Sequence, residues 1–403
     1  MPKPDQNHIH PTDVRGLSQL VIDATLGITN LVEALHSTIL RVPAPLGRIE
    51  DRPTVGITGL VYTSIRMITG LVGGSIDLAL APLVHGLRPP ESSTERDAAL
   101  AILNGVVGDY LQQQGNPLAL PMSLWMDGGC IDPHGTNIRP DVSTKILVII
   151  HGLCLNEQHW GIPDDYGQHL TDLGYTPVYV RYNTGLHIST NGRTFADVLA
   201  ALSSAWPQPI SEITILAHSM GGLVTRSACQ IAEETQHGWR QQLRSIIFLG
   251  TPHHGSPWER VGNWVHTLLL SSPYSAAFAR LGQIRSAGIT DLRYGTLRDA
   301  EWADTDRFAP LGDPRLPLAL PTNVDCYLVA SSTSDVEAEW WGDGLVPVAS
   351  ALGRHSDPRY DLESQAAGVW IGEQINHMGL LNHPAIDAQI RAWLTHPKPT
   401  PSA

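Results

Sequence analysis

Three residue types that together support nucleophilic catalysis occur in separate, glycine-containing segments of the chain. Ser219 stands in Ala217-His-Ser-Met-Gly-Gly222, between a segment that predicts a strand and one that predicts a helix. The small residues Ala217 and Gly221 permit the tight strand-to-helix turn that presents a nucleophilic serine at its tip. The alternative is an ordinary helix start with Ser219 as its N-cap. We interpret Ser219 as the nucleophile of an acyl-transfer site.

The candidate acid follows a later predicted strand. Asp343 lies in Gly342-Asp-Gly-Leu-Val-Pro347, where flanking glycines allow a sharp turn that aims the side chain. A carboxylate in that position can orient an imidazole ring and stabilise its charged form. Two alternatives stay open: Asp335 as the acid, and Asp343 as a turn residue that only binds its own backbone.

The candidate base is His377, in Asn376-His-Met-Gly-Leu-Leu381 after the last predicted strand. A general base must reach the serine hydroxyl, so it belongs on a loop at the same edge of the sheet. His383 is the neighbouring candidate. Because Pro384 is expected to begin the last helix, we interpret His383 as a cap instead.

Two backbone N–H groups are expected to stabilise the oxyanion that develops in acyl transfer. One is that of Met220, the residue after the serine, and the other is that of Leu153 in His151-Gly-Leu153. Gly152 would let this loop approach the reacting group closely. We name four residues as candidates for contacts with a substrate: Gly152, His218, His253 and Trp258. We assign no metal ligands.

Alternating strand and helix patterns must position these residues. Lys145–Ile150 (KILVII) is an unbroken apolar run, typical of a strand buried on both faces. Further strands are predicted at Pro177–Tyr182, Ile213–Ala217, Ser245–Leu249, Val324–Val329 and Gly368–Ile371. Helices are predicted at 95–114, Pro163–Leu173, 193–206, 221–234 and 385–394. Such alternation predicts an α/β fold with a mostly parallel sheet and functional residues at the carboxyl ends of the strands.

Composition narrows the function classes. The 403 residues include 39 Asp and Glu against 26 Lys and Arg, a net charge of −13, which disfavours nucleic acid as a partner. The four cysteines have no metal-ligand spacing, and we predict buried thiols. The polar, proline-broken start predicts no secretory signal, and therefore a cytoplasmic location.

Residues 14–88 are apolar and glycine-rich, with helices predicted near 15–40 and 54–85. The longest uncharged run of the second helix, Pro53 to Ile65, ends at Arg66 and is shorter than the ~20 residues that cross a bilayer. Three interpretations stay open: a helical hairpin packed on the main domain, a helix pair that lies on a lipid or polymer surface, and a self-association surface.

From about residue 120 to 395 the chain resembles a bacterial α/β-hydrolase of the lipase/esterase kind. The resemblance rests on the loop at 151–153, the serine turn, Gly250-Thr-Pro-His-His-Gly-Ser256 and the segment around Asp343, in that order. The Gly-Thr-Pro-His-x-Gly element also occurs in the branch similar to GPI inositol-deacylases. The order Ser219, Asp343, His377 is that of the α/β-hydrolase fold.

The resemblance implies a two-step hydrolysis of hydrophobic carboxylic esters, including aliphatic polyesters, with no cofactor and no ligand cluster that compels a structural calcium. It also implies a helical cap at about 256–320, with helices near 257–270 and 273–285. We therefore predict an N-terminal helical extension at 1–92, a hydrolase domain at 93–396 and a disordered tail at 397–403. Alternatives are an acyltransferase or thioesterase with the same triad, a lipid- or polymer-surface binding protein through residues 14–88, and an inactive scaffold.

Overall fold

The computed structural model divides the chain into two compact units. One comprises Met1–Ser92 with Gln113–Leu118, and the other Ser93–Gln112 with Ala119–Ala403. The residues that the structure describes are 12–13, 15–26, 63, 66–67, 69, 94–132, 135, 137–161, 165–256, 285–304, 313–333 and 342–395.

In the first unit, residues 15–26 are helical, within the predicted helix at 15–40. Gly16 of this helix packs so tightly on Leu118 that an added Cβ would lie 2.3 Å from Leu118 Cγ. Asn116 Nδ2 donates a 3.1 Å hydrogen bond to the Gly16 carbonyl, which fixes the same contact. The rest of that helix and nearly all of the predicted helix at 54–85 lie outside the described residues.

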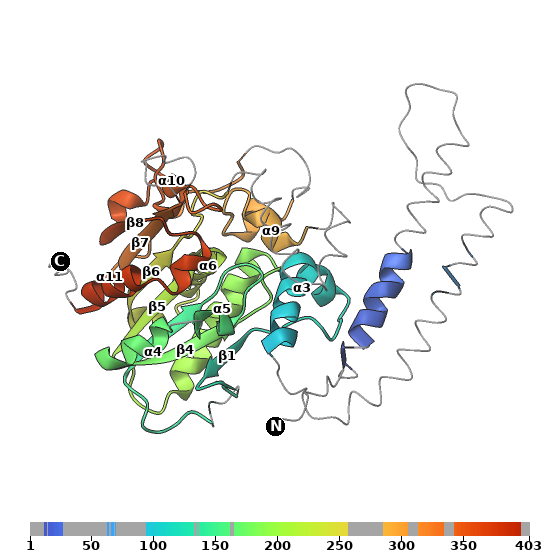
Figure 1. Ribbon diagram of the computed structural model, residues 1–403, viewed down its shortest axis with the longest axis horizontal. Helices are drawn as coiled ribbons and strands as arrows, with labels where there is room; N and C mark the ends of the chain where they lie inside the picture. Colours follow the sequence, from blue (N-terminus) through green and yellow to red (C-terminus); the bar gives the residue numbers. More distant parts are fainter. Residues whose placement is uncertain are drawn as a thin grey trace. The chain divides into compact units, whose positions relative to one another are not determined.

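The second unit is built on an eight-stranded sheet in the order β2-β1-β4-β3-β5-β6-β7-β8 (Figure 1). Its strands are β1 Ser123–Met126, β2 Gly129–Cys130, β3 Lys145–Ile150, β4 Tyr175–Arg181, β5 Glu212–His218, β6 Leu243–Leu249, β7 Asp325–Ser332 and β8 Gly368–Glu373. All pairings from β4 to β8 are parallel, which confirms the α/β class and each strand predicted from the sequence.

The β1–β2 hairpin was not predicted. β1 pairs antiparallel with both β2 and β4, and its turn has Asp127 at φ 52° and Gly128 at φ 75°. Two successive left-handed residues are the signature of a two-residue hairpin turn, for which Asp-Gly is a favoured pair. The signal was present in the sequence, in a strand too short to show a clear alternation.

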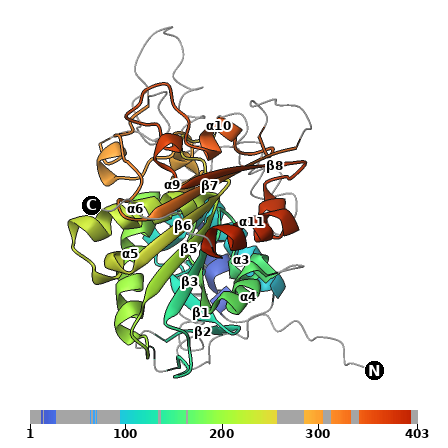
Figure 2. The ribbon, with the colours of Figure 1, turned by 90° about the vertical axis from the view of Figure 1, so that its left-hand side faces the viewer.

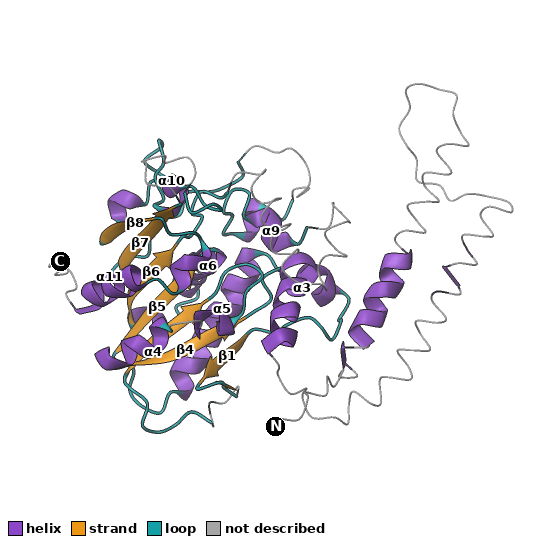
Figure 3. Cartoon of the chain, viewed as in Figure 1, coloured by secondary structure: helices purple, strands orange, loops and turns teal. Residues whose placement is uncertain are grey.

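Helices cover both faces of the sheet (Figure 2). α5 (Ile188–Ala205) and α6 (Met220–Glu234) pack side by side on one face, whereas α4 (Tyr166–His169) and α11 (Pro384–Thr395) lie on the other. α3 (Thr94–Gln113), α9 (Ala287–Asp291) and α10 (Val348–Ala351) complete the unit, with short 3₁₀ turns between elements (Figure 3).

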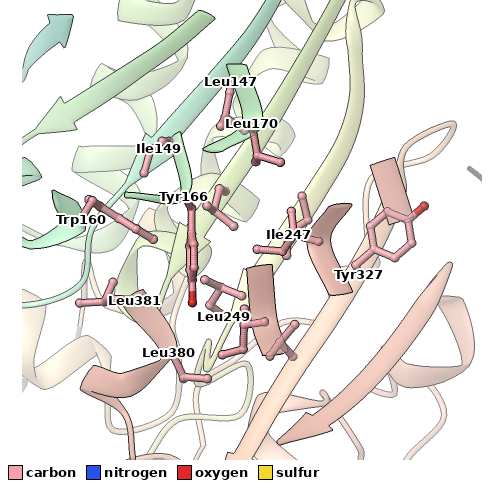
Figure 4. Close-up of a cluster of buried hydrophobic side chains, with 14 of the residues drawn as sticks. Leu147, Ile149, Trp160, Tyr166, Leu170, Ile247, Leu249, Tyr327, Leu380 and Leu381 are labelled. Carbon is pink, nitrogen blue, oxygen red and sulfur yellow. The ribbon is translucent and has the colours of Figure 1, made fainter. Parts of the chain in front are cut away.

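The core on the α4–α11 face includes buried side chains from β3, β4, β5, β6 and β7. Figure 4 shows part of this cluster. Alternate residues of neighbouring strands point to one side of a sheet, so Ile149, Leu216 and Ile247 form one row of this cluster. Tyr166 and Trp160 cover the row and are almost fully buried. Each such aliphatic side chain contributes about 1.5–3 kcal/mol on burial, so the central strands form a stiff platform for the loops at their ends.

Some sequence predictions differ from the structure. The helix predicted at Pro163–Leu173 begins instead at Tyr166, because Asp165 caps it by accepting a hydrogen bond from Gly167 N, and it ends as a 3₁₀ turn at Leu170–Leu173. Three cysteines are buried as predicted, but Cys130 is exposed at the end of β2; all four are free. Among the helices that the structure describes, each is too short or too polar to cross a bilayer.

Candidate active site

Ser219 occupies a strained turn between β5 and α6. Its φ of 53° and ψ of −124° are sparsely populated by residues with a side chain, and they fit a serine held at the tip of a strand-to-helix turn. Its backbone N–H donates to the Leu249 carbonyl at 2.8 Å, which ties the turn to the end of β6. Ser219 is therefore held in place by the two central strands.

The two glycines after the serine are required by packing. A Cβ on Gly221 would lie 2.7 Å from the His151 carbonyl oxygen, and one on Gly222 would lie 2.0 Å from Thr251 Oγ1. Real Cβ atoms essentially never approach other atoms so closely. The first turn of α6 thus fits against the ends of β3 and β6 only without side chains.

Gly152 follows β3 and crosses directly beside the serine. An added Cβ would lie 2.9 Å from Ser219 Cβ, 3.1 Å from His218 Nδ1 and 3.4 Å from Ser219 Oγ. The structure therefore brings the 151–153 loop to the serine, where a backbone N–H can approach a reacting carbonyl.

Asp343 and His377 form a buried pair. His377 Nδ1 donates to Asp343 Oδ2 at 2.6 Å, and the two residues are each 2% exposed. The other carboxylate oxygen accepts from the backbone N–H groups of Leu345 and Val346, at 2.9 and 2.8 Å. Since the backbone fixes the carboxylate, the carboxylate in turn fixes the orientation and the tautomer of the imidazole.

Two neighbours place this pair at the serine's end of the sheet. His218, which precedes Ser219, has its ring 4.7 Å from that of His377. Gly250, at the end of β6, has a left-handed φ of 57°, and an added Cβ would lie 3.2 Å from Asp343 Oδ2 and 3.3 Å from His377 Cε1. The imidazole thus lies against the residue before Ser219 and the one after Leu249.

His218 is fully buried, and desolvation lowers its pKa well below the usual value, as does the nearby His377. It is therefore neutral, and its Nε2 donates to the His377 carbonyl at 3.1 Å. Trp160 meets the ring edge-on at 6.1 Å. The hydrogen bond from His218 holds the backbone of His377 in place, and His218 Nδ1 faces Gly152.

The loop with the second N–H donor is supported by α3. Cys154 has a left-handed φ of 61°, and its N–H donates to Thr184 Oγ1 at 3.1 Å. An added Cβ on Gly105 would lie 2.2 Å from Cys154 Sγ. α3 therefore packs against the loop that contains Cys154 at a position where only glycine fits. Leu153, between Gly152 and this strained residue, is completely buried.

Met220 begins α6, and the first N–H groups of a helix have no acceptor within it. Its N–H is therefore available at the positive end of the helix. His151 has a structural place: its ring stacks on Tyr182 at 4.5 Å, and desolvation lowers its pKa to about 3.

His253 is the one remaining substrate-contact candidate within the described residues. The ring of His253 contacts Arg226 and Phe248, and no contact joins it to Ser219 or to the Asp343–His377 pair within the described residues. Trp258, Asp335 and the predicted cap helices lie outside them. Over the same part of the chain, no three His, Cys, Asp or Glu side chains converge as metal ligands.

The sheet order and the loop positions decide the architecture. Ser219 follows β5, Asp343 comes after β7 and His377 comes after β8, with an antiparallel strand near one edge of the sheet. The fold is that of an α/β-hydrolase. Gly250, which sequence reasoning did not single out within its motif, lies so close to the Asp343–His377 pair that a side chain there would meet both residues.

One family model matches part of the chain. Residues 191–327 match the family described as PGAP1-like alpha/beta domain. None of the curated proteins matches the chain.

Solved structures similar to the chain include the mature lipase BlEst2 of Bacillus licheniformis, with 18% identity, a TM-score of 0.41 and coverage of 64% of this chain and 94% of that one. The esterase Pf2001 of Pyrococcus furiosus has 12% identity and a TM-score of 0.37, over 63% and 81%. A thermophilic esterase of Thermogutta terrifontis has 14% identity and a TM-score of 0.36, over 63% and 90%.

Proposed function

We propose that the chain is a serine carboxylic ester hydrolase that acts on hydrophobic acyl esters through an acyl-enzyme at Ser219. The observation that carries the proposal is the 2.6 Å hydrogen bond from His377 to Asp343, next to the residue that precedes a strained serine. A buried, carboxylate-oriented imidazole is what a serine needs to become a nucleophile at neutral pH.

In the first step, His377 Nε2 takes the proton of Ser219 Oγ as this oxygen attacks the ester carbonyl. The N–H groups of Met220 and Leu153 stabilise the oxyanion, and the imidazolium is stabilised by Asp343. Collapse of the tetrahedral intermediate breaks the ester C–O bond, and the imidazolium protonates the leaving alcohol. Water, deprotonated by His377, then cleaves the acyl-enzyme and releases the acid.

The substrate class is proposed from the buried, apolar surroundings of the serine. Leu153 and Met220 are fully buried beside it, and the neutral His218 adds no charge. Such a site favours neutral, apolar acyl groups, including those of an aliphatic polyester. Gly152 and His218 are proposed to contact the substrate at the carbonyl, and His253 and Trp258 are proposed as further substrate contacts.

A panel of p-nitrophenyl esters of increasing acyl length, run beside a polyester emulsion, tests this proposal. We expect hydrolysis by the full chain and a loss of at least about 1000-fold in Ser219→Ala. Full activity in that variant would contradict the site. A thioester and an acceptor alcohol in the same panel distinguish the alternatives of thioesterase and acyltransferase.

A second candidate function, contact with a lipid or polymer surface, is favoured by the helix at residues 15–26. Leu17 and Val21, four residues apart and hence on one face of this helix, are 48% and 65% exposed. In the full chain, Leu17→Ser with Val21→Ser should reduce co-sedimentation with liposomes or polymer particles while sparing hydrolysis of soluble esters. Unchanged co-sedimentation would remove this candidate.

A further inference from the structure

Cys154, the residue after the proposed oxyanion donor Leu153, is held in a strained conformation. The N–H of Leu155 donates to the Gly152 carbonyl at 3.4 Å, so these four residues form a β-turn. Of its two central residues, only Cys154 has a positive φ, of 61°. That combination is a type II turn, in which glycine is the usual third residue. A residue with a side chain stays in such a conformation only where its surroundings hold it.

Two contacts hold Cys154, one on its backbone and one on its side chain. Its N–H donates to Thr184 Oγ1 at 3.1 Å. Its Sγ lies against Gly105 of α3, where an added Cβ would come within 2.2 Å of the sulfur. Burial raises the pKa of the thiol to about 12, so the side chain is an uncharged packing group at neutral pH. Because Cys154 is only 1% exposed, water cannot replace Thr184 as the acceptor of the N–H unless space is made for it.

Thr184 is itself fixed by the loop that follows β4. The preceding residue, Asn183, accepts from the Gly185 N–H at 3.0 Å through Oδ1, and its Nδ2 donates to the Gly108 carbonyl at 2.9 Å. The Gly185 carbonyl accepts from the Gly288 N–H at 3.0 Å. Thr184 is 1% exposed. Its hydroxyl is therefore an acceptor whose position is set by hydrogen bonds on both sides of it.

The direction of the Leu153 N–H depends on the peptide groups on both sides of this residue. Burial lowers the pKa of His151 to about 3, so its ring is neutral, and its Nδ1 donates to the Gly152 carbonyl at 2.9 Å. The C=O and N–H of one trans peptide point in opposite directions, so the Leu153 N–H points away from the His151 ring. The peptide on the other side, between Leu153 and Cys154, is held by Thr184. A shift of either peptide would displace the Leu153 N–H.

We propose that Thr184 is a positioning residue of the oxyanion site: by holding the Cys154 N–H, its hydroxyl keeps the Leu153 N–H in place at the reacting carbonyl. The inference rests on the proposed function, because it requires an oxyanion that forms at Ser219. Thr184 acts only through the loop. A displacement of about 1 Å in a catalytic group costs about 100-fold in rate, so loss of this hydroxyl should lower kcat by about that factor.

Thr184→Val tests the proposal because valine keeps the branched shape and removes the acceptor. We expect kcat and kcat/KM for a soluble p-nitrophenyl ester to fall by the same factor, about 100-fold, as for an interaction made only in the transition state. An alkyl boronic acid, which forms a tetrahedral anion on a nucleophilic serine, should bind more weakly by a similar factor. Thr184→Ser keeps the hydroxyl and should retain kcat within about threefold of the unaltered chain.

Thr214→Val is the matched control. Thr214 is fully buried near the start of β5, whereas Ser219 follows the end of this strand, and its Oγ1 donates to Glu212 Oε1 at 3.3 Å. This change should lower stability in urea and leave kcat within about threefold. Equal losses of kcat in the two valine variants would overturn the proposal, because they would show a general effect of removing a buried hydroxyl. Unchanged kcat in Thr184→Val, or a loss that Thr184→Ser shares, would also overturn it.

Failure of this inference and failure of the proposed function give different results. If the unaltered chain hydrolyses the ester and Ser219→Ala does not, the proposed function stands and the Thr184 variants alone decide the inference. If the unaltered chain hydrolyses no ester, both are overturned.

If Thr184→Val does not fold, Thr184→Ala takes its place, because alanine leaves space for a water molecule that can accept from the Cys154 N–H. That water is not anchored as the hydroxyl is, so kcat should still fall by at least about tenfold. An unchanged kcat in a folded Thr184→Ala would overturn the proposal.

Discussion

Replacing Gly152 by alanine is the substitution that most directly tests the geometry around the serine. The added Cβ would lie 2.9 Å from Ser219 Cβ and 3.1 Å from His218 Nδ1. Neither neighbour can retreat, because Ser219 is hydrogen-bonded to Leu249 and His218 is bonded to the His377 carbonyl. The loop at residues 151–153 must therefore move away from the serine.

The size of the loss in kcat follows from the position of the proposed oxyanion donor, the N–H group of Leu153, in this loop. A displacement of about 1 Å in a catalytic group costs about 100-fold in rate, and loss of one oxyanion donor costs about 100- to 1000-fold in kcat. We expect kcat to fall by that factor, equivalent to about 3–4 kcal/mol in activation free energy. Overpacking should lower the unfolding free energy by about 1–3 kcal/mol, so the protein still folds.

The assay is hydrolysis of a soluble p-nitrophenyl ester, with kcat and KM measured separately and urea unfolding measured on the same samples. Gly238→Ala is the matched control, since an added Cβ there meets no atom within 4 Å. This variant should leave kcat within about twofold of the unaltered chain and the free energy of unfolding within about 0.5 kcal/mol of it. If Gly152→Ala keeps kcat within about threefold of the unaltered chain, the placement of the oxyanion loop is refuted.

Three further predictions concern the acid, the buried histidines and a buried cation. Asp343→Asn should reduce kcat by about 10⁴-fold, because an amide no longer selects the imidazole tautomer, and unchanged kcat would exclude Asp343 as the acid. Burial lowers the pKa of five histidines of the described chain, among them the fully buried His151, His218 and His253. The unfolding free energy measured in urea should therefore fall as the pH drops below about 6.5, by up to about 1.4 kcal/mol per pH unit for each such histidine, because the unfolded chain then binds protons that the folded chain does not. A flat profile from pH 6.5 to 5 would contradict this expectation. Arg181→Met should cost about 3–5 kcal/mol, because the buried carboxylate of Glu157 loses its cation and that of Asp97 is left with Arg96, at 3.8 Å. The exposed Arg359→Met should cost less than about 1 kcal/mol, and equal costs would refute the difference.

The central sheet could be predicted because its residues carry their own signal. Lys145–Ile150 is buried on both faces, so its apolar run is unbroken, and the structure has β3 at those residues. The turn at Ser219 could be predicted for a similar reason: only small residues fit at Gly221 and Gly222, and this requirement is visible in the sequence.

Other features depend on contacts between distant segments. Two contacts join residues that are far apart in the chain: the close packing of Gly105 on Cys154 and the hydrogen bond from His218 to the His377 carbonyl. No local sequence pattern predicts either contact. The motif around His253 predicts a contact with the substrate, and in the structure the ring of His253 packs on Arg226 and Phe248. The position of a motif after a predicted strand predicts where its loop lies. The direction in which each side chain of the loop points depends on packing.

The β1–β2 hairpin and the start of α4 were missed for local reasons. β1 has only four residues, and the Asp127-Gly128 pair that makes its turn was not read as a hairpin signal. At α4, Pro163 suggested the first turn, whereas the side chain of Asp165 caps the helix at Tyr166. A capping aspartate competes with a proline two residues earlier, and the two signals predict different starts.

The most direct measurement of the central claim is covalent labelling with a fluorophosphonate, followed by peptide mass spectrometry. This reagent phosphonylates a serine that an adjacent base activates. We predict one label per chain, located on Ser219, and a strong reduction of labelling in His377→Ala with folding retained. A full-length, folded chain that takes no label, or that takes it at another serine, would contradict the assignment of Ser219, Asp343 and His377 as a catalytic triad.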